Sequence, residues 1–352
     1  MRMSKTFLDT LSAELRHMQP LHGLILAHST VVLVIVAWRG DIAATAHQWY
    51  VEQFAPLYFL ALPVAYAAAR LVLAAVRAPG MRLPRLARLP ELLGRAAGAA
   101  ITFTALLLFL GSFTTFKTLM PFFWGGFPQD RFLADLDAAL HGGTDPGPFL
   151  LGHLDNPLII EALQWNYAAV WSALAFVPLF FVVLQAPRLR LRYCLSFVLV
   201  WATLGNVLAC AFLSAGPAFY GAVTGDTARF GPQMQALQGT LSSAFQAYLW
   251  DIQRQNIVGF GTGISAFPSV HVGVAMMNAL FLRDISRIAG FAGFVYVAIV
   301  ALSSVLFGWH YAIDGYVSIL VVTLLHAALK RLFGESRHAT AGDGLTPSPA
   351  TP

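Results

Sequence analysis

The chain has 352 residues, of which 57% are hydrophobic and only 11% are charged, whereas soluble domains carry about 25% charged residues. This composition excludes an ordinary soluble domain. The long apolar runs indicate helices that cross a bilayer, since each crossing needs about 20 residues and must satisfy its own backbone hydrogen bonds. The net charge of +5 does not indicate a nucleic-acid partner, because the basic residues lie in short segments between the apolar runs. We therefore predict an all-α polytopic membrane protein with about eight transmembrane helices.

In chain order, the apolar runs predict spans near residues 22–38, 54–76, 96–122, 158–184, 193–213, 264–282, 288–307 and 310–329. We interpret the first run as an uncleaved span, because Arg39 and Asp41 separate it from the weak cleavage-like stretch Ala44-Thr45-Ala46. The tail from Gly334 to Pro352 is rich in Gly, Ser, Thr and Pro, which predicts disorder. Nothing in the pattern predicts the oligomeric state.

The basic residues predict how the protein is oriented in the membrane. With the N-terminus in the cytoplasm, 16 of the 22 Lys and Arg residues fall in cytoplasmic segments. Both termini are then cytoplasmic, and the two longest loops, 123–157 and 214–263, face outward. In a bacterium this corresponds to an inner-membrane protein whose long loops face the periplasm.

The first candidate site is the glycine-rich stretch that runs from Gly259 to His271. Pro268 suits a first helical turn, and this would place Ser269 and His271 in that turn. A helix N-terminus presents free N–H groups and a partial positive charge, which suit a phosphate. Taken alone, however, such a stretch is more often a glycine-rich connection that carries a surface histidine.

The second candidate site combines His310 and Asp314, which are four residues apart and therefore share one helical face. A carboxylate that accepts from one imidazole nitrogen fixes the tautomer and leaves the other nitrogen free to attack. Asp314 falls near the start of a predicted span, where an ionisable residue is a functional candidate. The alternative for this motif alone is a purely structural His–Asp hydrogen bond.

Two further features fall on the predicted outward side. The stretch Ser214-Ala215-Gly216-Pro217, followed by Tyr220, ends the fifth span and by itself is typical of a Gly-Pro helix stop. Lys117 lies near the outer end of the third span. Its amine either extends to the membrane interface or holds a phosphate.

The first long outward loop carries three aspartates, Asp130, Asp137 and Asp145. Their spacing fits no metal-binding loop. We interpret this segment as a solvated acidic loop, and we predict neither a metal ion nor a cofactor.

Both histidine motifs fall on one predicted side of the membrane, whereas unrelated features would be spread over both. The segments Phe267-Pro-Ser-Val-His271 and His310-x-x-x-Asp314 resemble the second and third signature motifs of the type 2 phosphatidic acid phosphatase superfamily. The stretch Ser214–Pro217 with Tyr220, and the region from Lys117 to Pro146, are similar to the branch that contains inositol phosphorylceramide synthase.

The resemblance covers about residues 112–330 and implies the organisation of the chain. A six-helix core would occupy residues 96–333. Two extra spans and a basic cytoplasmic loop would precede it at 1–95, and the tail at 334–352 would follow it.

The resemblance also implies a chemical role for each motif residue. His310 would attack phosphorus and form a phosphohistidine, and Asp314 would orient it. His271 would protonate the leaving oxygen and later activate water or an acceptor alcohol. Phosphate oxygens of a membrane lipid would be held by Ser269 and backbone amides, and the other candidate substrate-binding residues are Lys117, Gly216, Pro217, Tyr220 and Arg254.

Two usual phosphate-binding arginines of the superfamily are missing. The first motif normally has Arg-Pro seven residues after its lysine, but Trp124 stands at that distance from Lys117. The third motif normally has Arg six residues before its histidine, and Ser304 occupies this position. The inositol phosphorylceramide synthase branch shows the same pattern. The outward cations that remain to balance a phosphate are Lys117, Arg229 and Arg254.

Several functional alternatives stay open at this point. Within the lipid-modifying class, hydrolysis and head-group transfer are not separated. A haem-carrying membrane subunit would use His271 and His310 as axial ligands, although such ligands usually lie deeper in their spans. A transporter would need charges near the bilayer midplane, and the predicted spans carry few.

Overall fold

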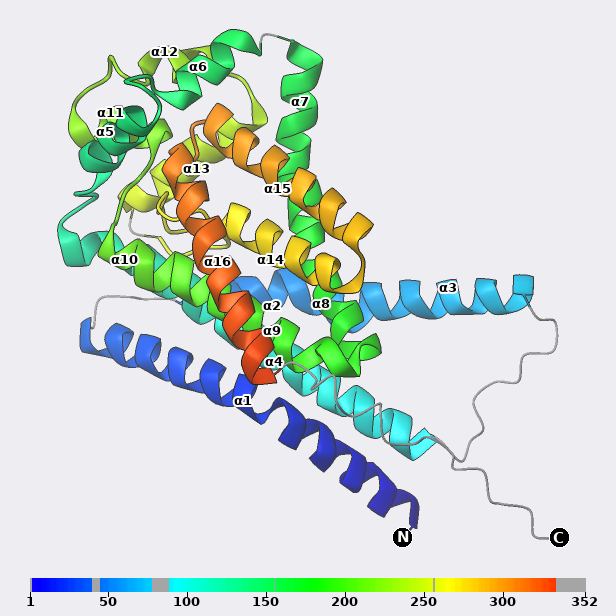
Figure 1. Cartoon of the computed structure of the whole chain (residues 1–352). Coiled ribbons are helices and arrows are strands. Elements are labelled where there is room, and N and C mark those ends of the chain that lie inside the picture. The colour runs from blue at the N-terminus through cyan, green and yellow to red at the C-terminus, as the bar shows by residue number, and fades with distance from the viewer. Residues whose placement is uncertain (1, 40–44, 78–88, 155, 256, 334–352) are drawn as a thin grey trace, which may run out of the picture.

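The computed structural model describes residues 2–39, 45–77, 89–154, 156–255 and 257–333. Across these residues the chain forms helices joined by loops, and no strand is present (Figure 1). Seven described helical segments are long and apolar enough to cross a membrane: Met3–Arg39, His47–Arg70, Leu89–Trp124, Pro157–Gln185, Pro187–Ala211, Arg287–Leu306 and Ala312–Phe333. The prediction of an all-α polytopic membrane protein is therefore confirmed.

Residues 3–211 supply five of these segments. They are α1 (Arg2–Arg39); α2 (His47–Pro56), which continues through the π-helical turn η1 (Leu57–Ala61) into α3 (Leu62–Arg77); α4 (Leu89–Trp124); α7 (Pro157–Trp165), which continues through η3 (Asn166–Val170) into α8 (Trp171–Gln185); and α9 (Pro187–Ala202), which continues through η4 (Thr203–Leu208) into α10 (Ala209–Ala211). The second half supplies α15 (Arg287–Leu306) and α16 (Ala312–Phe333).

The span predicted at 264–282 differs from the helix that forms there. Helix α14 (Val270–Ile285) has 16 residues, which gives a length of about 24 Å and falls short of the roughly 30 Å hydrocarbon layer. Its apolar run includes loop residues before Val270, so the run is longer than the helix. Most of α14 is buried, because it packs against α8, α9, α15 and α16.

Local sequence signals explain where several of these helices begin. Pro157 and Pro187 occupy the first turns of α7 and α9, where a missing N–H costs nothing. The Asn156 side chain accepts hydrogen bonds from the backbone N–H groups of Leu158 and Ile159. Ser269 and Ser286 cap α14 and α15 in the same way.

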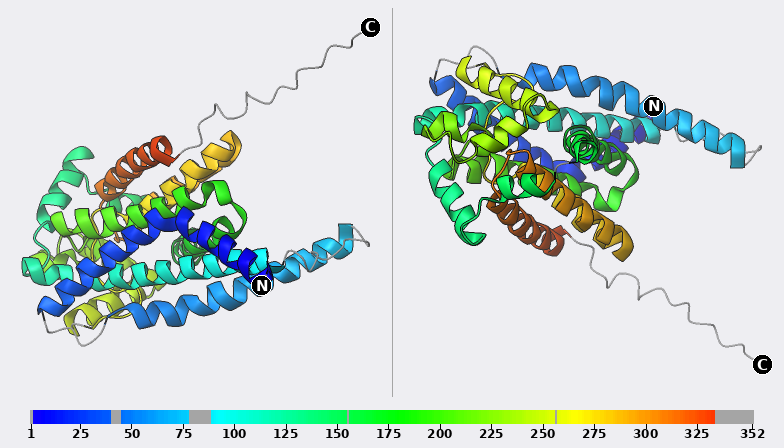
Figure 2. Two further views of the ribbon diagram at one scale, coloured as in Figure 1. Left: turned by 90° about the horizontal axis from the view of Figure 1, so that it is seen from below. Right: turned by 90° about the horizontal axis from the view of Figure 1, so that it is seen from above.

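The helices form a bundle with an extension on one side. Helix α1 runs beside α4, and α2 packs on α4 as well (Figures 1 and 2). Helix α3 continues beyond the bundle in all three views. The predicted division at residues 95 and 333 stays a prediction, and the tail predicted to be disordered, 334–352, lies outside the described residues.

Short helices from the two long loops gather at one end of the bundle (Figure 1). They are α5 (Asp130–Leu140), α6 (Pro146–His153), η5 (Pro217–Phe219), α11 (Tyr220–Thr224), α12 (Gly231–Ala236) and α13 (Leu241–Gln255). Contacts of α5 with α16 and of α6 with α15 hold these short helices over the ends of α15 and α16 that flank His310.

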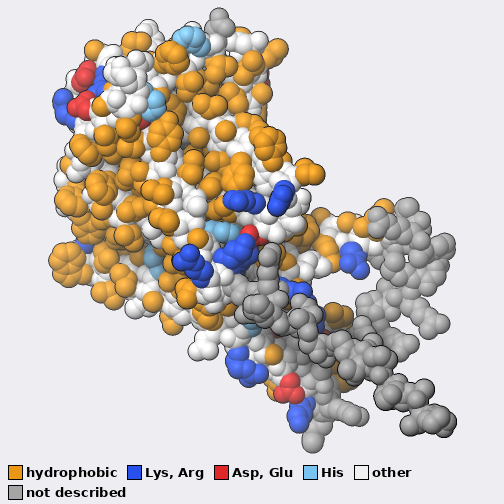
Figure 3. Space-filling view, in the orientation of Figure 1, with side chains coloured by type: hydrophobic (Ala, Val, Ile, Leu, Met, Phe, Trp, Pro, Cys, Tyr) orange, Lys and Arg blue, Asp and Glu red, His pale blue; other side chains and the backbone are white. Residues whose placement is uncertain are grey.

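Basic segments meet at the other end of the bundle. Arg192 Nη2 lies 2.8 Å from Asp284 Oδ2, and Lys330 also pairs with Asp284. Asp284 belongs to the last turn of α14, whereas His271 belongs to its first turn. On the face shown in Figure 3, most Lys and Arg side chains lie in the middle and lower right of the view. A separate charged cluster lies at the upper left.

Candidate active site

His271 and His310 line one cavity of about 270 Å³. Its walls come from α2, α4, η3, α8, α9, η5 and the residues just before it, α13, the loop that precedes α14 together with the first turn of α14, and the turn between α15 and α16. Lys117 also lines this cavity. The fold thus brings together three predicted site residues that are up to 193 positions apart in the sequence (310 − 117).

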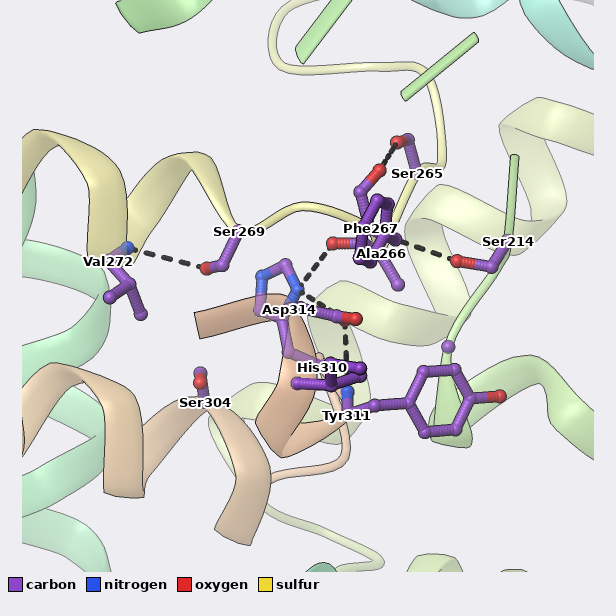
Figure 4. Close-up of polar contacts among 12 residues, drawn as sticks. Ser214, Ser265, Ala266, Phe267, Ser269, Val272, Ser304, His310, Tyr311 and Asp314 are labelled. Carbon is purple, nitrogen blue, oxygen red and sulfur yellow. Dashed lines mark hydrogen bonds and ion pairs between the residues drawn. The ribbon is translucent and has the colours of Figure 1, made fainter. Parts of the chain in front are cut away.

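Hydrogen bonds on one side of the ring hold His310 in place. Its Nδ1–H donates to the carbonyl oxygen of Ala266 at 2.7 Å and faces Asp314 Oδ2 at 3.3 Å (Figure 4). Asp314 is fully buried, and the same carboxylate oxygen accepts the backbone N–H of Tyr311 at 3.0 Å. A proton on Nδ1 leaves Nε2 as the unprotonated nitrogen, which is the state a nucleophile requires.

A tight turn places His310 between α15 and α16. Because α16 begins at Ala312, the prediction that His310 and Asp314 share one helical face is wrong. Gly308 follows the end of α15 and has φ +70°, a conformation that favours glycine. The backbone N–H of His310 then donates to the Ser304 carbonyl at 3.2 Å. Ser304, at the position of a missing family arginine, uses its own hydroxyl to donate to Ala301 O at 2.7 Å.

The Ser214–Pro217 stretch supports the loop that holds His310. Ser214 O accepts the N–H of Ala266 at 2.8 Å, and Ser214 Oγ accepts the N–H of Phe267 at 3.2 Å. Gly216 has φ +94°, and a Cβ there would lie 2.8 Å from the Trp309 carbonyl oxygen. This close approach requires glycine. Gly216 and Pro217, which are predicted to bind substrate, do not line the cavity, whereas the neighbouring Ala215 does.

His271 lies in the first turn of α14, as predicted, and its ring faces His310. The two ring centroids are 6.2 Å apart. The His271 ring stacks on Tyr167 at 4.6 Å and contacts Trp171 at 4.0 Å. Trp171 Nε1–H also donates to the His271 carbonyl at 2.9 Å, so the aromatic residues of η3 and α8 fix this turn.

Pro268 and Ser269 lie before helix α14, although the sequence predicts them in its first turn. Helix α14 begins at Val270, so Pro268 precedes the helix and Ser269 is its N-cap. The Ser269 side chain is fully buried, and its Oγ accepts the N–H of Val272 at 3.3 Å. The prediction of both residues in the first helical turn is therefore wrong, because the cap takes a residue with extended backbone.

Lys117 is the cation of the cavity. Its side chain is half-buried and makes no ion pair with any residue in the described part of the chain. The other two outward cations are placed differently. Arg254 is exposed on α13 and is not part of the cavity wall, and Arg229 pairs with Asp145 at 2.9 Å and with Asp135 at 2.6 Å.

The interpretation of 123–157 as a solvated acidic loop is wrong for two of its three aspartates. Asp130 is fully buried; its carboxylate accepts the N–H groups of Ala215 at 2.7 Å and Gly216 at 2.8 Å, and the Tyr311 hydroxyl at 2.8 Å. Burial raises the pKa of Asp130 to about 6, and these three donors oppose the rise by favouring the charged form. Above that pH the carboxylate form therefore predominates.

Asp137 lies two helical turns further along α5 and binds the start of α16. It is 2% exposed, and its two carboxylate oxygens accept the N–H groups of Ala312 at 3.0 Å and Ile313 at 2.9 Å. These amides belong to the first turn of α16, where N–H groups have no partner within the helix. Loop spacing gave no sign of this role, because the amides come from distant segments.

Tyr220, a predicted substrate-binding residue, is 2% exposed and packs away from the cavity. Its ring lies 5.1 Å from the Phe230 ring, in a cluster with Leu133 and Tyr311.

Sequence reasoning missed three other residues that line the cavity. Among the described residues, no hydrogen-bond partner contacts Tyr167 Oη, Trp201 Nε1 or Trp309 Nε1. Unpaired buried donors of this kind call for a ligand or water.

A family model of the PAP2 superfamily matches residues 131–328, which is more than half of the chain. The chain belongs to the PAP2 superfamily. The match includes His271, His310 and Asp314, whereas Lys117 and the helices α1 to α4 precede it. Comparisons with curated proteins and with solved structures found no match. As a PAP2 superfamily member the protein has the fold of a phosphatase or phosphotransferase family, embedded in the membrane through its apolar helices.

Proposed function

We propose that this PAP2 superfamily protein is a lipid phosphatase or head-group phosphotransferase that works through a phosphohistidine on His310. One observation carries the proposal. The ring of His310, fixed through Nδ1 by Ala266 and Asp314, faces His271 across a cavity that also contains Lys117. A nucleophile, an acid–base group and a cation thus surround one space.

In the first proposed step, Nε2 of His310 attacks phosphorus. An N–P bond forms while the P–O bond to the lipid alcohol breaks. His271, protonated before the step, gives its proton to the leaving oxygen. Asp314 stabilises the positive charge that develops on the His310 ring, since its carboxylate faces Nδ1.

In the second proposed step, the phosphohistidine is consumed. Neutral His271 takes a proton from an acceptor hydroxyl while the acceptor oxygen attacks phosphorus and the N–P bond breaks. Water as the acceptor gives hydrolysis, and a lipid alcohol gives head-group transfer. The resemblance to the inositol phosphorylceramide synthase branch supports transfer.

Lys117 and the unpaired donors of Tyr167, Trp201 and Trp309 replace the missing arginines in this proposal. Each lines the cavity. One positive charge with several neutral donors is suited to a phosphodiester, which carries a single negative charge, and a head-group transferase acts on such a group. This is a second argument for transfer.

We also propose that the site lies on the outward face of the membrane. The basic segments occupy the opposite ends of α14 and α16 from the histidines. Basic segments favour the cytoplasmic side. On this proposal, both termini are cytoplasmic.

Mass spectrometry of membrane lipids from cells with and without the gene tests the proposed function. We expect one phosphate-containing lipid to accumulate when the gene is absent and a matching product to disappear. A product lipid that carries the transferred head group identifies transfer, whereas release of the lipid alcohol without such a product identifies hydrolysis. An unchanged lipid profile together with a haem absorption band of the purified protein would instead establish the haem-carrying alternative.

Replacing Lys117 tests the proposed cation. We expect Lys117→Met to lower kcat/KM for the lipid substrate by about 10²-fold, the usual cost of removing one group that stabilises transition-state charge. Arg254→Met is the matched control, because Arg254 is exposed and not part of the cavity wall. Equal kinetic constants for the two variants would rule out Lys117 as a phosphate ligand.

A further inference from the structure

The cavity is also lined by aromatic residues, which we call its apolar end. They come from four separate segments: Tyr50 of α2, Phe113 of α4, Phe176 of α8 and Phe260 of the loop before α14. Lys117, His271 and His310 line the same cavity. One continuous space is therefore lined both by candidate phosphate-binding residues and by aromatic rings.

Helix α2, which precedes the residues matched by the family model (131–328), contacts the walls of this cavity directly. Tyr50 Oη and Thr114 Oγ1 form a hydrogen bond of 2.6 Å, about one helical turn before Lys117. The Tyr50 ring lies 5.2 Å from the Phe260 ring. Further along the chain, Tyr58 Oη donates to the carbonyl of Phe176 at 2.9 Å. Tyr50 of α2 and Tyr58 of η1 thus contact two other walls of the apolar end.

The backbones of α2 and α4 approach closely at the start of α2. A Cβ added to Gly111 of α4 would lie 2.5 Å from His47 Cδ2. His47 Nε2 also lies 3.0 Å from Ser112 Oγ. The contact leaves no layer of lipid between the two helices at this level.

The opposite face of α2 is directed away from the protein. Trp49 is 43% exposed, whereas Tyr50 beside it is 4% exposed. Val51 on this outer face is 49% exposed. Because α2 begins a membrane-crossing segment, His47–Arg70, these apolar side chains face the bilayer. Helix α2 therefore stands between the apolar end of the cavity and the lipid.

We infer that the apolar end binds the hydrocarbon next to the phosphate of the lipid substrate, with Tyr50 as the residue that selects lipid over water-soluble phosphate esters. The inference rests on the proposed function for the polar end. A hydrocarbon attached to a phosphate between His271 and His310 must leave through the same space, and this aromatic end is continuous with it. A larger groove of about 420 Å³ lies between α6, α15 and α16, but Lys117 and the two facing histidines do not line it.

Kinetic selectivity provides the first test. The probes are dioleoyl phosphatidylglycerol in detergent micelles and its water-soluble counterpart, glycerophosphoglycerol, which are both phosphodiesters. We expect Tyr50→Ala to lower the ratio of their kcat/KM values by about 10-fold or more, as loss of an aromatic contact with hydrocarbon predicts. Tyr50→Phe keeps the ring and should keep the ratio within about 2-fold. Trp49→Ala is the control on the lipid-facing side of the same helix. An unchanged ratio in Tyr50→Ala, or an equal drop in Trp49→Ala, would overturn the inference.

Photo-crosslinking provides a test that needs no turnover. A phosphatidic acid analogue with a diazirine on a chain carbon close to the glycerol is bound to the His310→Ala protein and illuminated. We expect the labelled peptide to come from α2 or from the segments around Phe176 and Phe260. Labelling confined to α6, α15 and α16 would overturn the inference and leave the catalytic proposal intact. Labelling of α2 in a protein whose wild type has no lipid activity would refute the proposed function and uphold the binding site.

Discussion

His310→Ala is expected to lose at least about 10⁴-fold in turnover of its lipid substrate, because the proposed covalent intermediate has no other nucleophile to form on. The Ala266 carbonyl and Asp314 hold only the Nδ1 side of this ring. With the ring removed, neither group can replace Nε2 as the attacking atom. The measurement is product formation per mole of purified, monodisperse protein in detergent.

A chemical trap separates loss of the nucleophile from loss of folding. Wild-type protein incubated with a substrate labelled at phosphorus should carry an acid-labile label, and His310→Ala should carry none. His271→Ala should still be labelled by a substrate whose leaving group needs no protonation, because His271 acts on the leaving oxygen and the acceptor. His153→Ala is the matched control, since His153 is exposed on α6. Wild-type turnover in His310→Ala would refute the mechanism.

Asp130→Asn is expected to lower the free energy of unfolding by about 2–3 kcal/mol, the scale of one buried charge-assisted hydrogen bond left without its acceptor. The carboxylate accepts from two backbone amides and the Tyr311 hydroxyl. An amide side chain keeps one acceptor oxygen and turns its NH₂ toward at least one N–H donor. The thermal unfolding midpoint in detergent measures this loss.

The same substitution should reduce activity in the fraction that stays folded. The Asp130 carboxylate accepts hydrogen bonds from the Gly216 N–H and the Tyr311 hydroxyl. Gly216 lies close to the Trp309 carbonyl. Asp130 is therefore linked to the segments on both sides of His310. We expect turnover to fall while KM changes little, because the nucleophile is displaced and Lys117 is not. Asp135→Asn is the control on the same helix. Asp135 is 73% exposed, and its pair with Arg229 is worth about 1 kcal/mol at most. Equal midpoints and turnover for the two variants would contradict this account.

The acidic loop shows why some of the site could not be predicted from sequence. The spacing of the three aspartates in this loop fits no metal-binding loop, so the natural interpretation is that their side chains are exposed to solvent. Asp130 and Asp137 are seven residues apart and therefore share one face of α5. That spacing is visible in the sequence, but it does not say what faces them. The partners are backbone amides from segments 85 to 176 residues away, and only the fold brings them there.

The two missing arginines show the same limit. From sequence, Lys117, Arg229 and Arg254 are the outward candidates for the cation, and Lys117 and Arg254 are predicted to bind substrate. Arg229 pairs with Asp135 and Asp145, and Arg254 is exposed on α13. Only Lys117 of these three lines the cavity. Charge type is a property of the sequence, whereas the availability of a charge depends on its neighbours in space.

The sequence by itself determined that the protein spans a membrane, because hydrophobic length is a local property of the chain. It also determined the two histidine motifs, since the residue types and the four-residue separation of His310 and Asp314 are visible in the chain, although His310 lies in the turn before α16 and not on that helix. Tertiary structure alone decided that α14 is a short central helix, that Asp130 and Asp137 hold the turn around His310, and that α2 completes the cavity. These features depend on contacts between residues far apart in the chain, and no local pattern encodes the distance between them.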